Sequence, residues 1–438
     1  MIHEAFSAKF VRNVDANRTI KDELTAAIRA QGARRRISVT DLVNPRKAFF
    51  SRTHPEIQPS ADRSQAMMAG TGFHNEFERA VSTDEFAEQL VEFEGIVGKI
   101  DIYENIPVEL KTTRSLRSGL DAVYPQYVDQ LGMYAVMTGH NAGHLLIYGR
   151  GEFGRPPELR AYKLGFDDLE AIKAEIIHRR DQLSRALDTG DPAGLLRCTW
   201  YGRCEYESIC GCAEAAELGR IVPAASVRIE RDARLENLFA GKLGDDNSKV
   251  SGFRFFHLVF PRKAAFGLLD DTEEAPATSQ ERLAQMDRRG FYRALDEILY
   301  RGIPGAFRST PVRLGQFADR VRLYREVPTI LKSTRARDFL ERKRLAIDRP
   351  WNVDTLAFQC ALAGIEKGRL VLYYEALPDD KFMVYEMMFN DLPAIRAEVE
   401  RRLSLLESGA PPSELPACPA WMAKTCPYRD RCGCGDAA

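Results

Sequence analysis

Hydrophobic and polar residues alternate along residues 91–111, a pattern typical of β-strands that bury one face. The turn-forming residues Glu104, Asn105 and Pro107 interrupt the alternation, so the pattern predicts strands joined by a turn. Other stretches predict further elements: helices at 72–81, 125–138 and 166–187, and a strand at 144–149. Because strands and helices follow one another in this way, we expect an α/β fold.

Three charged residues share one expected face of these strands. Glu109 and Lys111 are two residues apart, so their side chains lie on the same face, and Asp101 of the preceding strand can meet Glu109 across the pair. Two carboxylates this close repel each other unless a cation separates them. Mg²⁺ suits the position because it prefers oxygen ligands, and it would lower the pKa of a bound water and offset phosphoryl charge. Lys111 would lie beside that water and orient it.

The alternative is a plain surface ion pair between Glu109 and Lys111, since Glu-x-Lys is by itself weak support for a site. Neighbouring polar residues favour the site. His74, a residue type that ligates metals, lies on an expected upstream helix. Gln130 and Tyr134 are four residues apart, so they share one face of an expected downstream helix.

The chain contains an internal repeat. Three segments of the first half match three of the second half, in the same order and at nearly the same spacing: 42–50 with 258–266, 106–113 with 327–334, and 127–148 with 352–373. Such a pattern predicts a duplication, and we expect two domains, residues 1–220 and 221–438. The length of 438 residues also favours two domains of roughly 200 residues each.

Eight of the nine cysteines form two groups that both end in C-x5-C-x-C. The first group is Cys198, Cys204, Cys210 and Cys212, and the second is Cys418, Cys426, Cys432 and Cys434. Clustered thiolates in a reducing compartment are typical of zinc or iron–sulfur ligands. The ninth cysteine, Cys360, is expected to be a small core residue.

Charge and hydropathy narrow the class of protein. The net charge of -1 excludes a polybasic protein, but a local basic groove would be enough to bind nucleic acid. We find no apolar run long enough to span a bilayer, and the N-terminus lacks the apolar core of a signal peptide. We therefore expect a cytoplasmic protein that does not associate with membranes. No P-loop is present, so any helicase activity would belong to a partner chain.

The order of these motifs resembles that of the PD-(D/E)xK nuclease superfamily: a histidine, an aspartate, Glu-x-Lys, Gln-x3-Tyr and then a cysteine cluster. The chain is most similar to the RecB-like branch, which includes AddB-type nuclease domains and CRISPR-associated iron–sulfur exonucleases. The resemblance covers about residues 38–212. It implies a restriction-endonuclease-like mixed sheet flanked by helices, present twice, with each copy ending in a four-cysteine cluster.

The resemblance also implies roles for individual residues. The implied ligands of Mg²⁺ or Mn²⁺ are His74, Asp101, Glu109 and the carbonyl of Leu110. Lys111 is implied to be catalytic together with the two carboxylates. Gln130 and Tyr134 are implied to face the active site, where they hold the DNA strand or order the site.

One residue departs from the family pattern. Asn44 stands where a cysteine usually precedes Pro-Arg, and Cys212 is an additional cysteine at the far end of the first copy. We hypothesise that Cys212 replaces the missing ligand, so that each cluster closes locally. A [4Fe–4S] cluster is the expected group, two in all, and tetrahedral zinc is the alternative.

The second copy lacks the expected chemistry. The repeat aligns Glu109, Asp101, Gln130 and Tyr134 with Ile330, Arg322, Thr355 and Gln359, and it places His74 near Arg288 or Arg289. Only Lys111 keeps its identity, as Lys332. Without carboxylates this copy cannot hold Mg²⁺, so we expect a pseudonuclease. It could bind phosphate through Arg288, Arg322 and Lys332, or it could be only a stabilising partner domain.

These observations favour a metal-dependent nuclease that hydrolyses DNA, at single strands or duplex ends, through a metal-activated water. One alternative is a non-catalytic nucleic-acid-binding assembly factor. Another is an end-trimming subunit in CRISPR adaptation or recombinational repair, working with a helicase or integrase-type partner chain.

Overall fold

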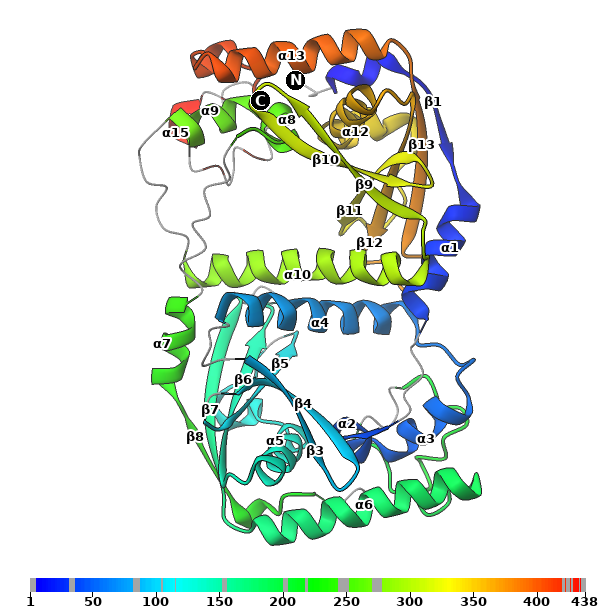
Figure 1. Cartoon of the computed structure of the whole chain (residues 1–438), viewed down its shortest axis with the longest axis vertical. Coiled ribbons are helices and arrows are strands. Elements are labelled where there is room, and N and C mark those ends of the chain that lie inside the picture. Colours follow the sequence, from blue (N-terminus) through cyan, green and yellow to red (C-terminus); the bar gives the residue numbers. More distant parts are fainter. Residues whose placement is uncertain are drawn as a thin grey trace. The chain divides into compact units, whose positions relative to one another are not determined.

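The computed structural model divides the chain into two compact units (Figure 1). It describes residues 5–30, 36–81, 87–103, 105–114, 116–151, 156–199, 204–216, 220–242, 252–269, 278–419, 422, 426, 428–432 and 434. Unit 2 is Arg29–Asn247 with Ala277–Asp296, and unit 1 is Met1–Ile28, Ser248–Pro276 and Glu297–Ala438. The units differ from the expected domains 1–220 and 221–438, because residues 1–28 group with the C-terminal half and residues 221–247 and 277–296 group with the N-terminal half.

Unit 2 is built on a mixed sheet with the strand order β2-β4-β5-β6-β7-β8, and β3 pairs with β4. Its strands are β2 (Ile37–Ser38), β3 (Ala87–Phe93), β4 (Ile96–Tyr103), β5 (Pro107–Thr113), β6 (Ala142–Gly149), β7 (Glu158–Phe166) and β8 (Val227–Arg231). β4 and β5 run antiparallel, whereas β5 and β6 run parallel. A parallel pair requires a crossover connection, which here contains the helix α5.

Helices cover both faces of this sheet (Figure 1). They are α2 (Val39–Val43), α3 (Pro45–Thr53), α4 (Ala61–Val81), α5 (Pro125–Thr138), α6 (Leu169–Thr189), α7 (Ala233–Lys242) and the part of α10 (Ser279–Gly302) up to Asp296; short 3-10 turns lie at Gly119–Ala122 and Ala224–Ser226. α5 and α6 pack on one face, and α4, α7 and α10 on the other. The prediction of a helix at 125–138 is confirmed: Pro125 begins α5, and Gly139 ends it with a left-handed φ of 71°.

The antiparallel helices α4 and α10 touch through glycine. A Cβ atom placed on Gly72 would lie 2.1 Å from the carbonyl oxygen of Gly290, and one on Gly290 would lie 2.2 Å from that of Gly72. Glu76 forms an ion pair with Arg293 beside this contact. Only glycine lets the two backbones approach this closely.

Unit 1 has a second mixed sheet, in the order β1-β13-β12-β11-β10-β9. Its strands are β1 (Val11–Ala16), β9 (Phe307–Leu314), β10 (Phe317–Tyr324), β11 (Val327–Thr334), β12 (Lys367–Tyr374) and β13 (Phe382–Phe389). β10 and β11 run antiparallel and β11 and β12 run parallel. The protein is therefore a mixed α/β structure in which helices flank mixed sheets, as the sequence predicts at this coarse level.

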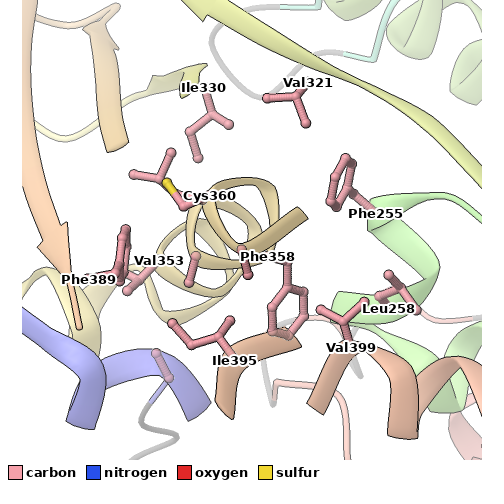
Figure 2. Packing of buried hydrophobic residues seen from close by; sticks show 14 of the residues in the cluster. Phe255, Leu258, Val321, Ile330, Val353, Phe358, Cys360, Phe389, Ile395 and Val399 are labelled. Carbon is pink, nitrogen blue, oxygen red and sulfur yellow. The ribbon is translucent and has the colours of Figure 1, made fainter. Parts of the chain in front are cut away.

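The core of unit 1 surrounds the helix α12. Its helices are α1 (Arg18–Arg29), α8 (Phe255–Val259), α9 (Pro261–Leu269), α11 (Leu345–Asp348), α12 (Pro350–Ala363), α13 (Leu392–Glu407) and α15 (Arg429–Cys432), with 3-10 turns at Phe6–Phe10, Arg342–Arg344 and Pro412–Glu414. Figure 2 shows Phe358 of α12 near Ile395 and Val399 of α13. Cys360 is fully buried in this cluster, which confirms its prediction as a core residue.

Candidate active site

Two adjacent strands of unit 2 position the central charged groups. Val108 and Leu110 of β5 point into the apolar layer under α4, so the alternation turns Glu109 and Lys111 towards α5. The Glu109 carboxylate is paired with the Lys111 ammonium. Asp101 of β4 accepts a hydrogen bond from the Leu110 amide at 2.8 Å through its Oδ2 atom. The hairpin thus brings Asp101, Glu109 and Lys111 together, as their spacing predicts.

His74 joins this group from α4. Its Nδ1 atom lies 3.5 Å from the Oδ1 atom of Asp101, and both side chains are largely buried. Phe73 fixes this part of α4, because its ring stacks on that of Tyr148 in β6 with centroids 3.9 Å apart. Such a pair stabilises the packing by about 1 kcal/mol.

The two carboxylates have opposite pKa shifts. Burial alone would raise the pKa of Asp101, but His74, Lys111 and the Leu110 amide together hold that pKa below its usual range. Burial, with a smaller repulsion from Asp101, raises the pKa of Glu109 to about 7 despite the attraction of Lys111. The pair therefore combines a carboxylate that stays ionised with one that resists ionisation.

α5 adds a chain of hydrogen bonds on the same side of the sheet. Lys111 donates to the Oε1 atom of Gln130 at 2.7 Å, and the amide of Gln130 lies 3.4 Å from the hydroxyl of Tyr134. Tyr134 in turn donates to the backbone carbonyl of Lys99 at 2.9 Å. Gln130 and Tyr134 thus hold the ammonium group of Lys111 in place.

Tyr127 is a member of the site that the sequence analysis missed. The ammonium of Lys111 lies 5.7 Å from the centre of its ring, within the range of a cation–π interaction. Tyr127 precedes Gln130 by three residues, so helical spacing from Gln130 could have identified it.

The carboxylate oxygen atoms of Glu109 and Asp101 indicate whether the site suits a cation. The Oε2 atom of Glu109 is buried and has no hydrogen-bond partner among the described residues, and the whole residue is only 2% exposed. Leaving a buried carboxylate oxygen unpartnered costs about 1–3 kcal/mol. Within the described part of the chain, no three His, Cys, Asp or Glu side chains already stand in an arrangement that could hold a metal ion. The donors present at Glu109 and Asp101 are nevertheless of the kind that Mg²⁺ and Mn²⁺ prefer.

The first cysteine group lies in one apolar cluster with α3 and the end of α6. The thiol of Cys212 is within hydrogen-bonding reach of those of Cys198 and Cys210. The backbone amide of Lys47, near the start of α3, donates to the Sγ atom of Cys198 at 3.2 Å. Asn44, which stands where the family has a cysteine, accepts a hydrogen bond from the hydroxyl of Thr199 at 2.9 Å.

The second group repeats this arrangement in unit 1. Cys434 lies beside Cys418 and Cys432, as Cys212 lies beside Cys198 and Cys210. All nine cysteines are free thiols.

An arginine holds each cysteine loop. Arg46 donates to the carbonyl of Cys210 at 2.8 Å and to that of Leu195 at 2.9 Å. Arg262 makes the matching bonds to Cys432, at 3.1 Å, and to Leu415, at 3.2 Å. The sequence analysis aligned these arginines within the repeat but assigned them no role.

The positions of unit 1 that correspond to the two carboxylates hold apolar residues. Ile330 is buried in the core of unit 1 together with Val321. Tyr103 pairs with Pro107, but Leu323 pairs with the matching Pro328, so the register aligns Asp101 with Val321 and not with Arg322. The sequence alignment missed this because four residues separate Leu323 from Pro328, whereas three separate Tyr103 from Pro107.

The three residues proposed to bind phosphate in the second copy are divided between the two units, with Arg322 and Lys332 in unit 1 and Arg288 in unit 2. Arg322 points to the other face of its sheet, where its guanidinium lies 5.6 Å from the ring of Phe307 and lines a mainly apolar pocket. Lys332 is exposed on β11 of unit 1, whereas Arg288 is exposed on the part of α10 that belongs to unit 2.

Comparisons with known proteins identify no family. No family model matches the chain, and no curated protein matches it. Among solved structures, the chain is similar to one described as "Crystal structure of SSO0001", with 20% sequence identity and a TM-score of 0.30, over 46% of this chain and 96% of that one. This TM-score is too low for the likeness to bear on fold or function.

None of the described helices has the length and apolar composition needed to cross a bilayer.

Proposed function

We propose that the protein is a metal-dependent nuclease that hydrolyses phosphodiester bonds of DNA, and that unit 2 carries the active site. The observation that supports this most is the buried, unpartnered Oε2 atom of Glu109 beside the ionised Asp101. An oxygen in that position gains a partner when a divalent cation binds. The resemblance of the motif order to PD-(D/E)xK nucleases points to the same chemistry.

Asp101, Glu109, His74 and the carbonyl of Leu110 would hold Mg²⁺ or Mn²⁺. The cation would act as a Lewis acid, lowering the pKa of a water and offsetting charge on the phosphoryl group.

The residues of the chain prepare the site for this cation. Hydrogen bonding to Gln130 fixes Lys111 next to Glu109, so a positive charge is already aimed at the position of the phosphate. Tyr134 is held by the Lys99 carbonyl and keeps Gln130 in place. The opposite pKa shifts of the two carboxylates suit a site that becomes fully ionised when the cation arrives.

The test is the digestion of end-labelled single-stranded and duplex DNA with Mg²⁺ or Mn²⁺. Asp101→Asn and Lys111→Met should abolish cutting, whereas Glu92→Gln, which changes an exposed carboxylate on the neighbouring strand β3, should not. Cutting that survives both active-site substitutions would reject the proposal. DNA binding without any metal-dependent cutting would instead favour the non-catalytic assembly factor.

The same proposal includes a tandem duplication whose second copy is a pseudonuclease. The pairing register supports it: Glu109 lies opposite Leu145 in the parallel pair of unit 2, and Ile330 lies opposite Leu370 in that of unit 1. Ring stacking supports it as well, because Phe50 stacks on Tyr206 as Phe266 stacks on Tyr428.

The four thiols of each copy would hold a [4Fe–4S] cluster or a zinc ion. Four buried or half-buried sulfur atoms lie together in each copy, and the backbone amide of Lys47 in α3 donates to that of Cys198. This arrangement supports four thiolates as the ligands. Elemental analysis of iron and zinc in the purified protein distinguishes the two groups.

A further inference from the structure

Each sheet is completed by an edge strand that comes from an unexpected part of the chain. β8 pairs with β7 in unit 2, although it begins the second half of the sequence. β1 pairs with β13 in unit 1, although it begins the first half. Figure 1 shows β1 running beside β13, with α1 following it.

The two edge strands occupy the same place in their sheets. One row of paired residues crosses unit 2 through Glu109, Leu145, Tyr162 and Arg231. The matching row crosses unit 1 through Ile330, Leu370, Tyr385 and Ala16. β8 therefore holds the position in unit 2 that β1 holds in unit 1, and each strand leads into a helix, α7 or α1.

We propose that each repeat of the chain donates its first strand and helix to the sheet of the other repeat. Residues 11–29 complete the sheet of the second repeat, and residues 227–242 complete that of the first. This is the exchange of an identical element that occurs in domain-swapped dimers, here within one chain. The inference rests on the proposed duplication, but it does not depend on nuclease activity.

Contacts of α7 show how firmly the donated segment is bound. Phe239 is fully buried in the apolar layer that also holds Phe77, with ring centroids 5.4 Å apart. Glu236 accepts a hydrogen bond from the amide of Ala161 in β7 at 3.1 Å. Burial of this ring removes apolar surface from water and so stabilises the attachment of α7 to the unit.

The exchange gives the second repeat a role that needs no carboxylates. The unit that contains Asp101, Glu109 and Lys111 takes β8, α7 and part of α10 from residues after 220. Deleting the second repeat would remove an edge strand and part of the apolar layer from this unit. A pseudonuclease repeat is therefore kept because the other repeat cannot complete its fold without it.

The test uses the full chain with a specific protease sequence inserted between Leu218 and Gly219, so that one cut separates the repeats. Two cysteine pairs probe the exchanged strands: Asp15→Cys with Glu386→Cys, and Lys163→Cys with Glu230→Cys. Directly opposed residues have Cα atoms about 4.5–5.5 Å apart, which suits a disulfide. The control pairs join residues that would lie opposite each other if each repeat kept its own first strand. They are Asp15→Cys with Lys163→Cys, and Glu230→Cys with Glu386→Cys.

After mild oxidation and cutting, the two exchanged pairs should hold the two pieces together on a non-reducing gel, well above the level of the parent chain with its native cysteines. Because Glu386 also pairs with Arg369, Asn13→Cys with Met388→Cys provides a second test on the same strands. Separation of the pieces in all exchanged pairs, or a disulfide found within one piece by peptide mass spectrometry in a control pair, overturns the proposal. Disulfide formation reports strand pairing and not DNA cutting. Neither result therefore confirms or rejects the nuclease proposal, which the digestion of DNA tests.

Discussion

Glu109 lies two residues before Lys111 on β5, and its carboxylate is paired with the Lys111 ammonium while its second oxygen stays buried without a partner in the described structure. The pair is therefore only half satisfied. An arrangement of this kind is costly to stability and is typical of sites where a ligand completes the set of contacts.

Divalent cations should stabilise the protein through this oxygen. At a concentration about 100 times the Kd, Mg²⁺ or Mn²⁺ adds about 2.7 kcal/mol to the free energy of unfolding. The thermal melting temperature of the wild type should rise with added cation, and that of Glu109→Gln should not. Glu92→Gln, the exposed matched control, should keep the full response. An equal rise in Glu109→Gln would show that the cation binds elsewhere.

Lysine substitutions should show which of the two repeats carries the active site. Lys111→Met should lower the rate of metal-dependent DNA cutting by at least about 100-fold, because it removes the positive charge beside the carboxylates. Lys332→Met changes the equivalent lysine, two residues after Ile330 on β11, and should leave the rate unchanged. Equal losses in the two variants would contradict the assignment of the active site to unit 2.

Arg46 should be required for metal in the first cysteine group only. Arg46→Met frees the carbonyls of Cys210 and Leu195, so the loop that carries the thiols loses its anchor. Iron or zinc content should fall by about half relative to the wild type, and Arg262→Met should cause the same loss from the second group. The double variant should lose nearly all of the metal. Full metal content in both single variants would argue against these arginines as positioning residues.

The crossing of α4 and α10 should not tolerate a methyl group. Gly72→Ala would place a Cβ atom 2.1 Å from the Gly290 carbonyl oxygen, so the helix backbones would have to move apart. The expected loss in the free energy of unfolding is about 1–3 kcal/mol, measured by chemical denaturation. Gly194→Ala is the matched control, because a Cβ atom there would meet nothing within 4 Å.

His257 should make the stability of unit 1 depend on pH. Its Nδ1 atom accepts a hydrogen bond from the Arg254 amide at 3.0 Å, and burial, with a smaller effect of Arg254, lowers the pKa of His257 below 6.5. The folded state therefore holds the neutral imidazole, while the unfolded state takes up a proton near pH 6.5. Stability due to this group is present above pH 6.5 and is lost as the pH falls below that value.

Substitution should reveal this contribution of His257. His257→Asn keeps an acceptor for the amide and removes the titration, so melting temperatures should fall less between pH 7.5 and pH 5.5 than in the wild type. His178→Asn, an exposed control on α6, should leave the pH dependence unchanged. An unaltered pH profile in His257→Asn would contradict the neutral buried imidazole.

Local signals in the sequence predicted α5 and the face shared by Glu109 and Lys111, because Pro125, Gly139 and the alternation of β5 act over a few residues. The same signals placed the start of α4 at residue 72, although it begins at Ala61, because its first turns lack a regular apolar face. β7 was missed, and its last residue, Phe166, was assigned to the following helix. Asp168, which caps α6, was the signal for the true boundary.

Long-range features could not be predicted in this way. β1 pairs with β13 across most of the chain, and no property of residues 11–16 indicates that partner. The correspondence of Asp101 with Val321 depends on one additional residue between the paired positions Leu323 and Pro328, which only the strand register reveals.

The crossover from β5 through α5 to β6 carries Glu109, Lys111, Gln130 and Tyr134 within a single short connection. Asp101 and His74 come from outside this connection, but a site that depends so largely on one connection can lose its chemistry by a few substitutions while the surrounding layers stay intact. The corresponding connection from β11 through α12 to β12 carries Ile330, Thr355 and Gln359, and its sheet pairs as fully as the other. Because the side chains of the proposed active site and the packing of the sheet depend on different residues, selection can change one of them without changing the other.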